Sequence, residues 1–357
     1  MNGDPFAAYR ARILPADTEA AARAKARWDG VAKPLNGLGK LETAVIRIAA
    51  LLGNEQVRLD RRAVAVLCAD NGVVKEGVTQ TDASVTAVMA RRIAEHRSSV
   101  CLMAKTARAD VFAFDLGMLT RAEGVRDLSV GNGTANMTEG PAMTGEQALC
   151  AIANGVRLAE AFKKDGYDVL VTGEMGIGNT TTSSAVASVL LGLPVDTVTG
   201  RGAGLSDAGL ARKRDAIRRA IDRNRPDPKD PFDVLCKVGG FDLAGLAGLY
   251  IGAAIQRLPI VIDGLPSSVA AVLAARLVPE CRAAMLASHC SAEPVARAIL
   301  RELGLDPILF ADMKLGEGTG AVCMLPLLDM ALAVYHGSVT FSDTGIAQYV
   351  PQQGDDR

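Results

Sequence analysis

A series of short, continuously apolar runs most constrains what this chain can fold into. The runs are rich in Val, Ile, Leu and Ala, and they cover residues 63–70, 111–117, 168–174, 233–240, 259–264, 283–289 and 307–313. They do not alternate apolar with polar residues, which is typical of strands in a parallel sheet that helices cover on both faces. The segments between them are rich in Ala and Leu and have helical periodicity. The sequence therefore predicts an α/β fold with a doubly wound, mostly parallel sheet.

Polar or glycine residues follow these predicted strands. They lie at positions 70–72, 115–117, 173–174, 239–240, 263–264, 288–289 and 314–318. In open α/β sheets, ligands bind outside the carboxyl ends of the strands. We therefore expect a site along this edge of the sheet.

The chain before residue 61 has a different pattern. Residues 17–30 read as an exposed helix, with Asp17 as N-cap and Gly30 just past its end, and residues 43–53 read as a second helix. The first of these lacks a wide apolar stripe, so it is expected to pack against another part of the chain. A boundary is predicted near residue 61, where the strand pattern begins.

The overall charge argues for a small-molecule partner. The 357 residues include 39 Lys and Arg and 40 Asp and Glu, a formal charge of -1, which leaves no basic footprint for nucleic acid or an anionic membrane. The first twenty residues contain no uninterrupted apolar segment of the kind found in a secretory signal. The apolar stretch at 245–255 is too short to span a bilayer, and Pro326 and Asp329 interrupt the stretch at 321–335. We expect a cytoplasmic protein without a membrane span.

The cysteines and histidines predict neither disulfides nor a metal. The seven cysteines form no CxxC pair and lie mostly in apolar runs, which is typical of reduced thiols in a cytosolic protein. The three histidines, His96, His289 and His336, form no HExxH or HxxxH motif. No metal or other cofactor is expected.

The segment "VLVTGEMGIGNTTTSSAV" (169–186) combines a strand, a glycine turn and a helix start. Backbone N–H groups at a helix N-terminus suit a phosphate, so Gly176, Asn179 and Thr180 are candidate ligands. An ordinary strand-to-helix turn with Thr180 or Thr181 as N-cap would give the same pattern. The chain has no GK[ST] after this turn and no GxGxxG after its first strand, which disfavours nucleoside triphosphate hydrolysis and dinucleotide binding.

Two further segments offer phosphate or ribose contacts. "GRGAGLSDAGLARK" (200–213) places Gly202 in a glycine loop and Lys213 on the following helix, where it could also be a surface lysine of an amphipathic helix. "ASHCSAEP" (287–294) supplies Ser291, which could instead cap a helix.

"LFADMKLGEGTGAVC" (309–323) places the carboxylate of Glu317 among Gly316, Gly318 and Gly320. The glycines could form a tight turn that leaves Glu317 in solvent, or they could permit the close approach of a ligand. Glu174, at the end of another predicted strand, is a second acid for the same sheet edge. Together with the loop at 133–144, these motifs predict a pocket for a phosphorylated sugar and a flat base.

Taken in order, these motifs resemble those of the nicotinate-nucleotide:dimethylbenzimidazole phosphoribosyltransferase family. The motifs that carry the resemblance span nearly the whole chain: "KPLNGLGKLE", "ADNGVVKEGV", "GTANMTEGPAMT", "TGEMGIGNTTTSSA", "GRGAGLSDAGLARK", "VGGFDLAGLAG", "VIDGLPSSVAA", "SHCSAEP" and "MKLGEGTGA". The resemblance implies a Rossmann-like large domain at 61–330, a small helical domain formed by 1–60 with 331–357, and a homodimer. It also implies transfer of phosphoribose from nicotinate mononucleotide to a benzimidazole in cobalamin lower-ligand assembly, which gives an α-linked nucleotide and nicotinate.

The resemblance also implies roles for individual residues. Glu317 would be the general base, and Glu174 would orient the acceptor base or assist the proton transfer. Gly176, Asn179, Thr180, Gly202, Lys213, Ser291 and Gly316 would bind phosphate and ribose, and Gln80, Val88 and Leu315 would line the acceptor-base pocket.

Some positions depart from the family pattern. They are Asn71, Asp82, Val88, Val295 and Ala296. Because several of them belong to motifs around the acceptor pocket, a different benzimidazole, a purine or a phenolic acceptor stays open. A second alternative is a non-catalytic or heteromeric binding subunit of the same fold. The retention of both acids favours an active transferase.

Overall fold

One parallel sheet of six strands forms the centre of the protein in the computed structural model, which describes residues 4–350 and 352. The strands are β1 (Arg62–Ala69), β2 (Asp110–Gly117), β3 (Arg126–Asp127), β4 (Val169–Met175), β5 (Ile260–Ile262) and β6 (Met285–Ala287). Their order is β3-β2-β1-β4-β5-β6, and every pair is parallel. The strand order reverses between β1 and β4, and such a switch point is where α/β sheets of this topology bind ligands.

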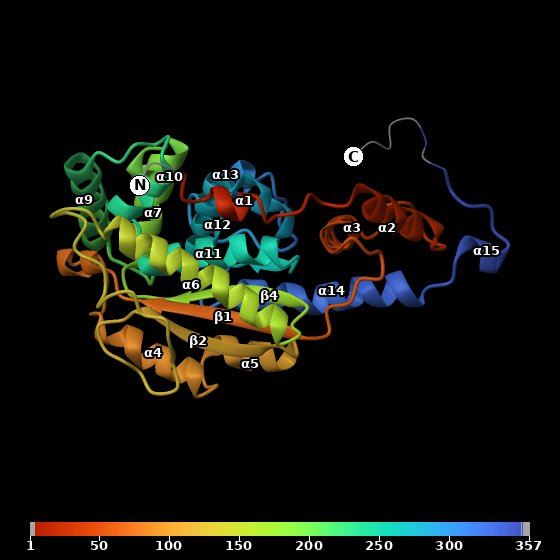
Figure 1. Cartoon of the computed structure of the whole chain (residues 1–357), viewed down its shortest axis with the longest axis horizontal. Coiled ribbons are helices and arrows are strands. Elements are labelled where there is room, and N and C mark those ends of the chain that lie inside the picture. Colours follow the sequence, from red (N-terminus) through yellow and green to blue (C-terminus); the bar gives the residue numbers. More distant parts are fainter. Residues whose placement is uncertain (1–3, 351, 353–357) are drawn as a thin grey trace.

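Helices connect the strands and extend the chain at both ends (Figure 1). The helices before β4 are α1 (Ala7–Arg10), α2 (Thr18–Gly30), α3 (Lys40–Leu52), the 3-10 helix η1 (Gly72–Glu76), α4 (Ser84–Ala94), α5 (Ser99–Thr106) and α6 (Gly145–Lys164). Those between β4 and β6 are α7 (Asn179–Leu191), α8 (Val195–Val198), α9 (Asp207–Asn224), α10 (Pro231–Val238), α11 (Phe241–Ile255), α12 (Leu265–Leu277) and η2 (Pro279–Ala284). After β6 follow α13 (Ala296–Leu303), α14 (Thr319–Gly337) and α15 (Phe341–Thr344).

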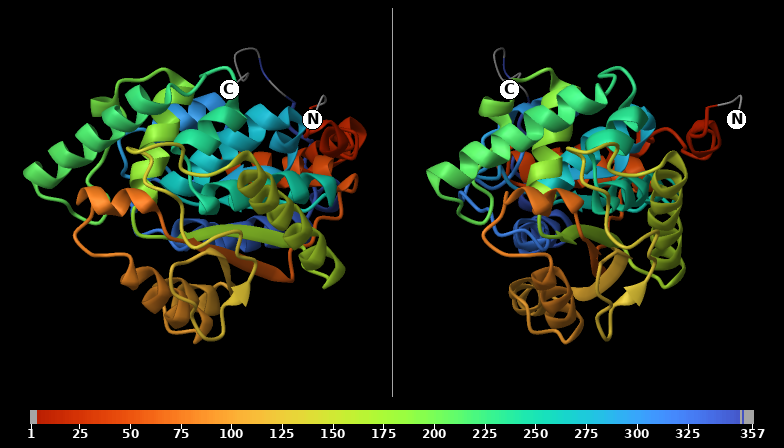
Figure 2. Two further views of the ribbon diagram at one scale, coloured as in Figure 1. Left: turned by 60° about the vertical axis from the view of Figure 1, so that its left-hand side comes forward. Right: turned by 90° about the vertical axis from the view of Figure 1, so that its left-hand side faces the viewer.

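Each face of the sheet carries its own hydrophobic core. Along β1, Ala65 and Leu67 point into a core with α6, α11 and α12, whereas Val64 and Val66 point into a second core with α4, α5 and α14. Figures 1 and 2 show α11 and α12 on one side of the sheet and α4 on the other. This two-sided burial is why the strands read as continuous apolar runs. The predicted doubly wound parallel sheet is therefore confirmed.

Two of the predicted strands are wrong, and one short strand was not predicted. Residues 233–240 fall largely in α10, because Asp230 accepts hydrogen bonds from the N–H groups of Phe232 and Asp233 and Pro231 opens the first turn. Residues 307–313 form a loop in which Leu309 makes an isolated parallel bridge with His289. The two-residue β3 has no apolar run to reveal it.

Among the described residues, α14 is the one helix long and apolar enough to cross a membrane by length and composition. Pro326 and Asp329 lie within it and do not end it, contrary to the interruption expected from the sequence. A core helix of a globular domain meets the same criteria, and Asp329 accepts a hydrogen bond of 3.0 Å from the buried Arg62 on β1. This ion pair fixes α14 to the sheet.

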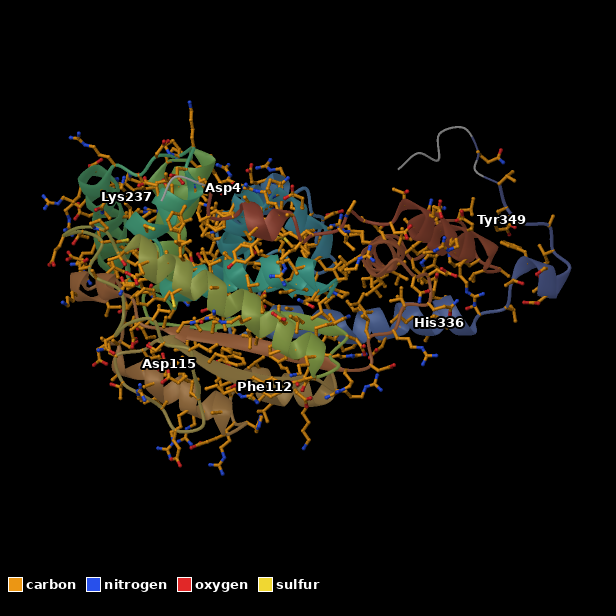
Figure 3. All side chains as sticks on the ribbon, viewed as in Figure 1. Asp4, Phe112, Asp115, Lys237, His336 and Tyr349 are labelled. Carbon is orange, nitrogen blue, oxygen red and sulfur yellow. The ribbon has the colours of Figure 1, made fainter. Side chains whose placement is uncertain are left out.

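Helix α2 and the end of α14, which are far apart in the sequence, meet beside the sheet. The rings of Trp28 on α2 and Tyr335 on α14 lie 5.0 Å apart, and Val31 bridges Thr340. Figure 3 shows His336 and Tyr349 at this extended end, whereas Phe112 and Asp115 mark β2 in the body of the molecule. These contacts are those expected of a small domain built from 1–60 and 331–357, although α14 crosses the predicted boundary at 330. The division stays a prediction.

The first described residues lie apart from α2 and α3. The ring of Phe6 packs edge-on against Phe232 of α10, at 5.7 Å between centroids, and Arg10 donates to the carbonyl of Leu277 at the end of α12. Figure 1 shows α1 beside α12. The N-terminal turn therefore covers the body of the molecule before the chain crosses to α2.

Candidate active site

A cavity of about 340 Å³ opens at the carboxyl edge of the sheet. Its walls are the end of β4, the start of α7, and the loops at 78–81, 201–205, 289–293 and 313–319. The sequence-predicted site residues that line it are Gln80, Glu174, Gly176, Asn179, Thr180, Gly202, Lys213, Ser291, Leu315, Gly316 and Glu317. Val88, on α4, does not line it and is 55% exposed, contrary to its predicted place in the acceptor-base pocket. Folding thus brings together segments that are more than 200 residues apart in the sequence.

The turn from β4 to α7 supplies one wall of the cavity. Gly176 is required there because a Cβ at this position would lie 2.3 Å from the carbonyl oxygen of Ala69, at the end of β1. Asn179 opens α7, and its side-chain amide donates to Glu174 Oε2. Asn179 was predicted to bind phosphate or ribose, and in this structure its amide orients the buried acid.

Glu174 is a strongly perturbed acid. Its side chain is buried at the end of β4, and burial raises its pKa well above the usual range of a glutamate. The negative charges of Asp242, Asp263 and Glu317 raise it further, against a lowering by the hydrogen bond from Asn179. Glu174 is therefore suited to hold a proton at neutral pH.

Glu317 sits in a strained turn at the start of α14. Its φ of +60° lies in the left-handed region, which is uncommon for a residue with a side chain. Its Oε2 accepts a hydrogen bond of 3.3 Å from the N–H of Val100, at the start of α5. The side chain is buried in the cavity wall and not in solvent. The flanking glycines therefore do not place this acid on the surface.

Asp263 fixes that turn through hydrogen bonds to the start of α14. It follows β5, and its two oxygens accept from the N–H groups of Gly318 at 3.1 Å and Ala321 at 2.9 Å. These bonds satisfy donors at the N-terminus of α14, which carry partial positive charge. Asp263 thereby fixes the start of α14 and, with it, the backbone of Glu317.

Lys213 supplies the buried cation of the cavity. Its Nζ donates to Thr180 Oγ1 at 2.8 Å and to the carbonyl of Gly200 at 3.1 Å. Burial lowers its pKa from 10.5 to about 8, although the carboxylate of Glu293 acts in the opposite direction. Gly202 has a φ of +53°, and a Cβ there would lie 2.8 Å from Thr180 Oγ1. The absence of a side chain at Gly202 therefore lets the loop backbone lie close to Thr180 and Lys213.

Gln80 and Ser291 connect loops that line the cavity. Gln80 donates from Nε2 to the carbonyls of Ala203 at 3.0 Å and Gly204 at 2.5 Å, so it ties two loops together. Ser291 donates to the carbonyl of Met313 at 3.3 Å. Leu315 lines the cavity while remaining 56% exposed.

Asp263, His289 and Glu293 also line the cavity, and sequence reasoning did not select them as site residues. The available signal was their position, since the first two lie at the ends of predicted strands and Glu293 follows His289 within four residues. Carboxyl ends of neighbouring parallel strands meet at one edge, so each of these positions was a candidate.

The described residues contain neither a disulfide nor a cluster of metal ligands. All seven cysteines are free thiols, and four of them are buried: Cys68, Cys101, Cys281 and Cys290. Within 4–350 and 352, no three His, Cys, Asp or Glu side chains are grouped so that they could hold a metal ion.

This topology, with a glycine turn at its switch point and a cavity lined by acids and a buried lysine, defines a Rossmann-like α/β protein with a candidate ligand site. A family model described as phosphoribosyltransferase matches residues 13–346. The chain belongs to the nicotinate-nucleotide:dimethylbenzimidazole phosphoribosyltransferase family, as the resemblance of its motifs implied.

Relatives of that name align along nearly the whole chain. The protein from Acetivibrio thermocellus is 44% identical over 328 residues, covering 91% of this chain and 93% of the relative. The protein from Desulforudis audaxviator is 44% identical over 340 residues, covering 94% and 96%. The crystal structure of the enzyme of that name from Thermus thermophilus superimposes with a TM-score of 0.87 at 39% identity, covering 93% of this chain and all of that one.

Proposed function

We propose that this enzyme transfers the phosphoribosyl group of nicotinate mononucleotide to a benzimidazole-type base, 5,6-dimethylbenzimidazole or a relative, in the assembly of the lower ligand of cobalamin. The products are nicotinate and an α-linked ribazole phosphate. The observation that carries this proposal is that one cavity is lined by two buried acids, Glu174 and Glu317, and by the buried cation Lys213 with several glycines. Relatives of this name, 44% identical, support it.

The Lys213 side of the cavity suits the phosphate. Lys213, Thr180 and the backbone at Gly176, Gly202 and Gly316 offer one cation and several donors around a space that a phosphate can enter. A bound dianion would also offset the desolvation that lowers the pKa of Lys213. Ribose would then extend from this site toward Ser291 and Asp263.

The acidic side of the cavity suits the chemistry at C1'. Nicotinate leaves from a pyridinium and needs no proton, so the acids are free to act on the acceptor. Attack by one nitrogen of a neutral benzimidazole places positive charge on its ring, and the N–H of the other nitrogen then gives its proton to Glu317. Attack from the face opposite the leaving nicotinate inverts C1' and gives the α-linkage. General-base assistance of this kind contributes roughly 10² to 10⁴ in rate.

Glu174 complements Glu317. Burial and neighbouring carboxylates raise its pKa and favour its protonated form, so it can orient the acceptor base within the cavity or assist the proton transfer to Glu317. Gln80 and Leu315 would complete the wall against the base, whereas Val88 lies outside the cavity of its own chain.

The test is nicotinate release from nicotinate mononucleotide, measured with a panel of benzimidazoles, adenine and phenols. Glu317→Gln should lower kcat by roughly 10² to 10⁴, with a smaller change in the KM for the donor. Glu19→Gln is the matched control, because the Glu19 side chain is 89% exposed on α2. The acceptor with the highest kcat/KM identifies the base. A folded protein that releases no nicotinate with any acceptor of the panel would favour the interpretation as a non-catalytic binding subunit.

We also propose that the protein is a cytoplasmic homodimer. The free thiols, most of them buried, suit a reducing compartment. Val88 on α4 and Leu102 on α5 leave large apolar side chains exposed on neighbouring helices, which supports a covering subunit. Light scattering should give twice the chain mass of 37.2 kDa, and a mass equal to one chain would contradict the dimer.

A further inference from the structure

His289 has no part in the mechanism above, yet it is built into the cavity wall. It lies two residues after the end of β6, it is only 4% exposed, and it lines the cavity with Asp263 and Ser291. Its ring lies against the first turn of α14, where a Cβ on Gly320 would be 2.1 Å from His289 Nδ1. The ring is therefore held in one place by close packing.

The hydrogen bonds fix which ring nitrogen carries the proton. Ser288 Oγ lies 2.5 Å from the carbonyl oxygen of Ile262, and a carbonyl can only accept, so the single hydroxyl proton of Ser288 points there. The 3.0 Å contact between Ser288 Oγ and His289 Nδ1 must then have Nδ1–H as the donor. Burial lowers the pKa of His289, against the opposing effect of Asp263, and so favours the neutral ring. In the neutral ring, Nε2 carries the lone pair.

The other ring nitrogen, Nε2, is the one available to a ligand. It has no hydrogen-bond partner among residues 4–350 and 352, and it is not enclosed by protein atoms, so it opens to the cavity that the residue lines. When a ligand fills the cavity and displaces water, an acceptor left without a partner is unfavourable. The most direct way to satisfy it is a donor on the bound ligand.

We propose that His289 Nε2 accepts a hydrogen bond from a ribose hydroxyl of the phosphoribosyl donor. This inference rests on the proposed function for the identity of that ligand. At neutral pH, the hydroxyls are the donors that nicotinate mononucleotide offers, since its phosphate is ionised and its pyridinium ring carries no N–H. A neutral imidazole can accept this bond without adding a further negative charge beside the phosphate, which an extra carboxylate would do.

The position of His289 is consistent with a ribose contact. His289 lies just beyond the end of β6, beside the strand β5 that Asp263 follows, and two residues before Ser291. Asp263 and Ser291 are the residues toward which the ribose is proposed to extend. His289 is thus proposed to bind and orient the sugar.

The first test is the tautomer. The chain has three histidines, so ¹⁵N-labelled histidine gives a spectrum that His289→Asn can assign by loss of one pair of signals. We expect His289 at pH 7 to be neutral with the proton on Nδ1. A proton on Nε2, or a charged ring, would overturn the inference.

The second test is binding of nicotinate mononucleotide and its 2'-deoxy and 3'-deoxy analogues, measured by calorimetry. In His289→Asn, the short amide can still donate to Ser288 but cannot reach the position of Nε2, whereas His289→Gln can place an amide oxygen there. We expect His289→Asn to weaken binding of the nucleotide by about ten-fold and His289→Gln to restore part of the loss. The analogue that lacks the bonded hydroxyl should bind wild type and His289→Asn equally.

Two outcomes would overturn the assignment. Equal binding of the nucleotide by wild type and His289→Asn would remove the hydrogen bond. If His289→Asn weakened binding of the nucleotide and of both analogues equally, His289 would only support the cavity wall. Binding is separate from turnover, so a protein that shows the analogue pattern without releasing nicotinate keeps this inference and fails the proposed function. A wild type that binds no nucleotide fails both.

Discussion

The backbone of Glu317 packs directly on Gly173 of β4, one residue before Glu174. A Cβ on Gly173 would lie 2.4 Å from the carbonyl oxygen of Glu317, so no other residue fits there without moving the turn. The central strand thus carries one acid and provides the seat for the other. The relative positions of the two acids depend on this contact between residues 144 positions apart in the sequence (317 minus 173).

Gly173→Ala should therefore displace Glu317. We expect a fall in kcat of at least roughly ten-fold, since small displacements of a reacting group are costly. The unfolding free energy should also fall by roughly 1–3 kcal/mol, as in other overpacked cores. Steady-state nicotinate release and thermal melts measure the two effects. Gly30→Ala, where a Cβ meets open space, is the control. A variant with normal kcat would show that the turn tolerates the shift.

The lowered pKa of Lys213 predicts that binding of nicotinate mononucleotide weakens at high pH. Its pKa in the free protein is about 8, so above that pH a proton must be taken up before the ammonium group can meet the phosphate. Affinity for nicotinate mononucleotide should be level below about pH 8 and then fall by up to about ten-fold for each pH unit above it. Lys213→Met should bind weakly and lack this fall, whereas the exposed Lys229→Met should behave as wild type. Calorimetry across this range measures both, and a wild-type profile without the fall would argue against a phosphate contact.

Asp242, the second residue of α11, predicts a pH-dependent stability. It is fully buried with no partner for Oδ2, and burial raises its pKa from 3.8 to about 6. The stability contributed by its protonated form is complete below about pH 4 and is lost as the pH rises through about 6. Asp242→Asn stays neutral, so its unfolding free energy relative to wild type should increase over this interval by roughly 3 kcal/mol.

Denaturant unfolding at several pH values tests this expectation. The exposed Asp222→Asn serves as control, and its difference from wild type should not change over the interval. A constant difference for Asp242→Asn as well would mean that Asp242 ionises normally in the folded protein.

Gly320→Ala should disturb His289 without removing it. The added Cβ would lie 2.1 Å from the imidazole, so the ring has to leave its place against α14. We expect a loss of nucleotide binding similar to that of His289→Asn, about ten-fold, with unfolding free energy lower by roughly 1–3 kcal/mol. Gly337→Ala, at the other end of the same helix with open space around the Cβ, should leave binding unchanged. Unaltered binding in Gly320→Ala would show that the ring has room to move.

Part of the candidate site could be predicted from local sequence. Gly176, Asn179 and Thr180 lie in one strand-turn-helix segment, and its pattern locates a possible phosphate turn without knowledge of the rest. Lys213 and Glu317 could be selected only as candidates, because a lysine on a helix and an acid in a glycine turn are more often exposed. The motif order along the chain, and not any one residue, indicated the family.

Other parts depended on contacts that no local pattern contains. Lys213 contacts Thr180, and Gln80 connects two loops beside the cavity, because separate elements meet there. Residues 233–240 were predicted as a strand, but most of them belong to helix α10. A short apolar run fits either a buried strand or a buried helix, and here the N-cap at Asp230 favours the helix.

Continuous apolar runs and ordered motifs are local properties, so they were sufficient to predict a parallel α/β sheet with polar strand ends and to indicate a phosphoribosyltransferase family. The contact of Glu317 with Gly173, the burial of Lys213 against Thr180 and the hydrogen bond between His289 and Ser288 were visible only in the folded chain. The first two contacts arise from close packing between segments that are distant in the sequence, and burial lowers the pKa values of Lys213 and His289.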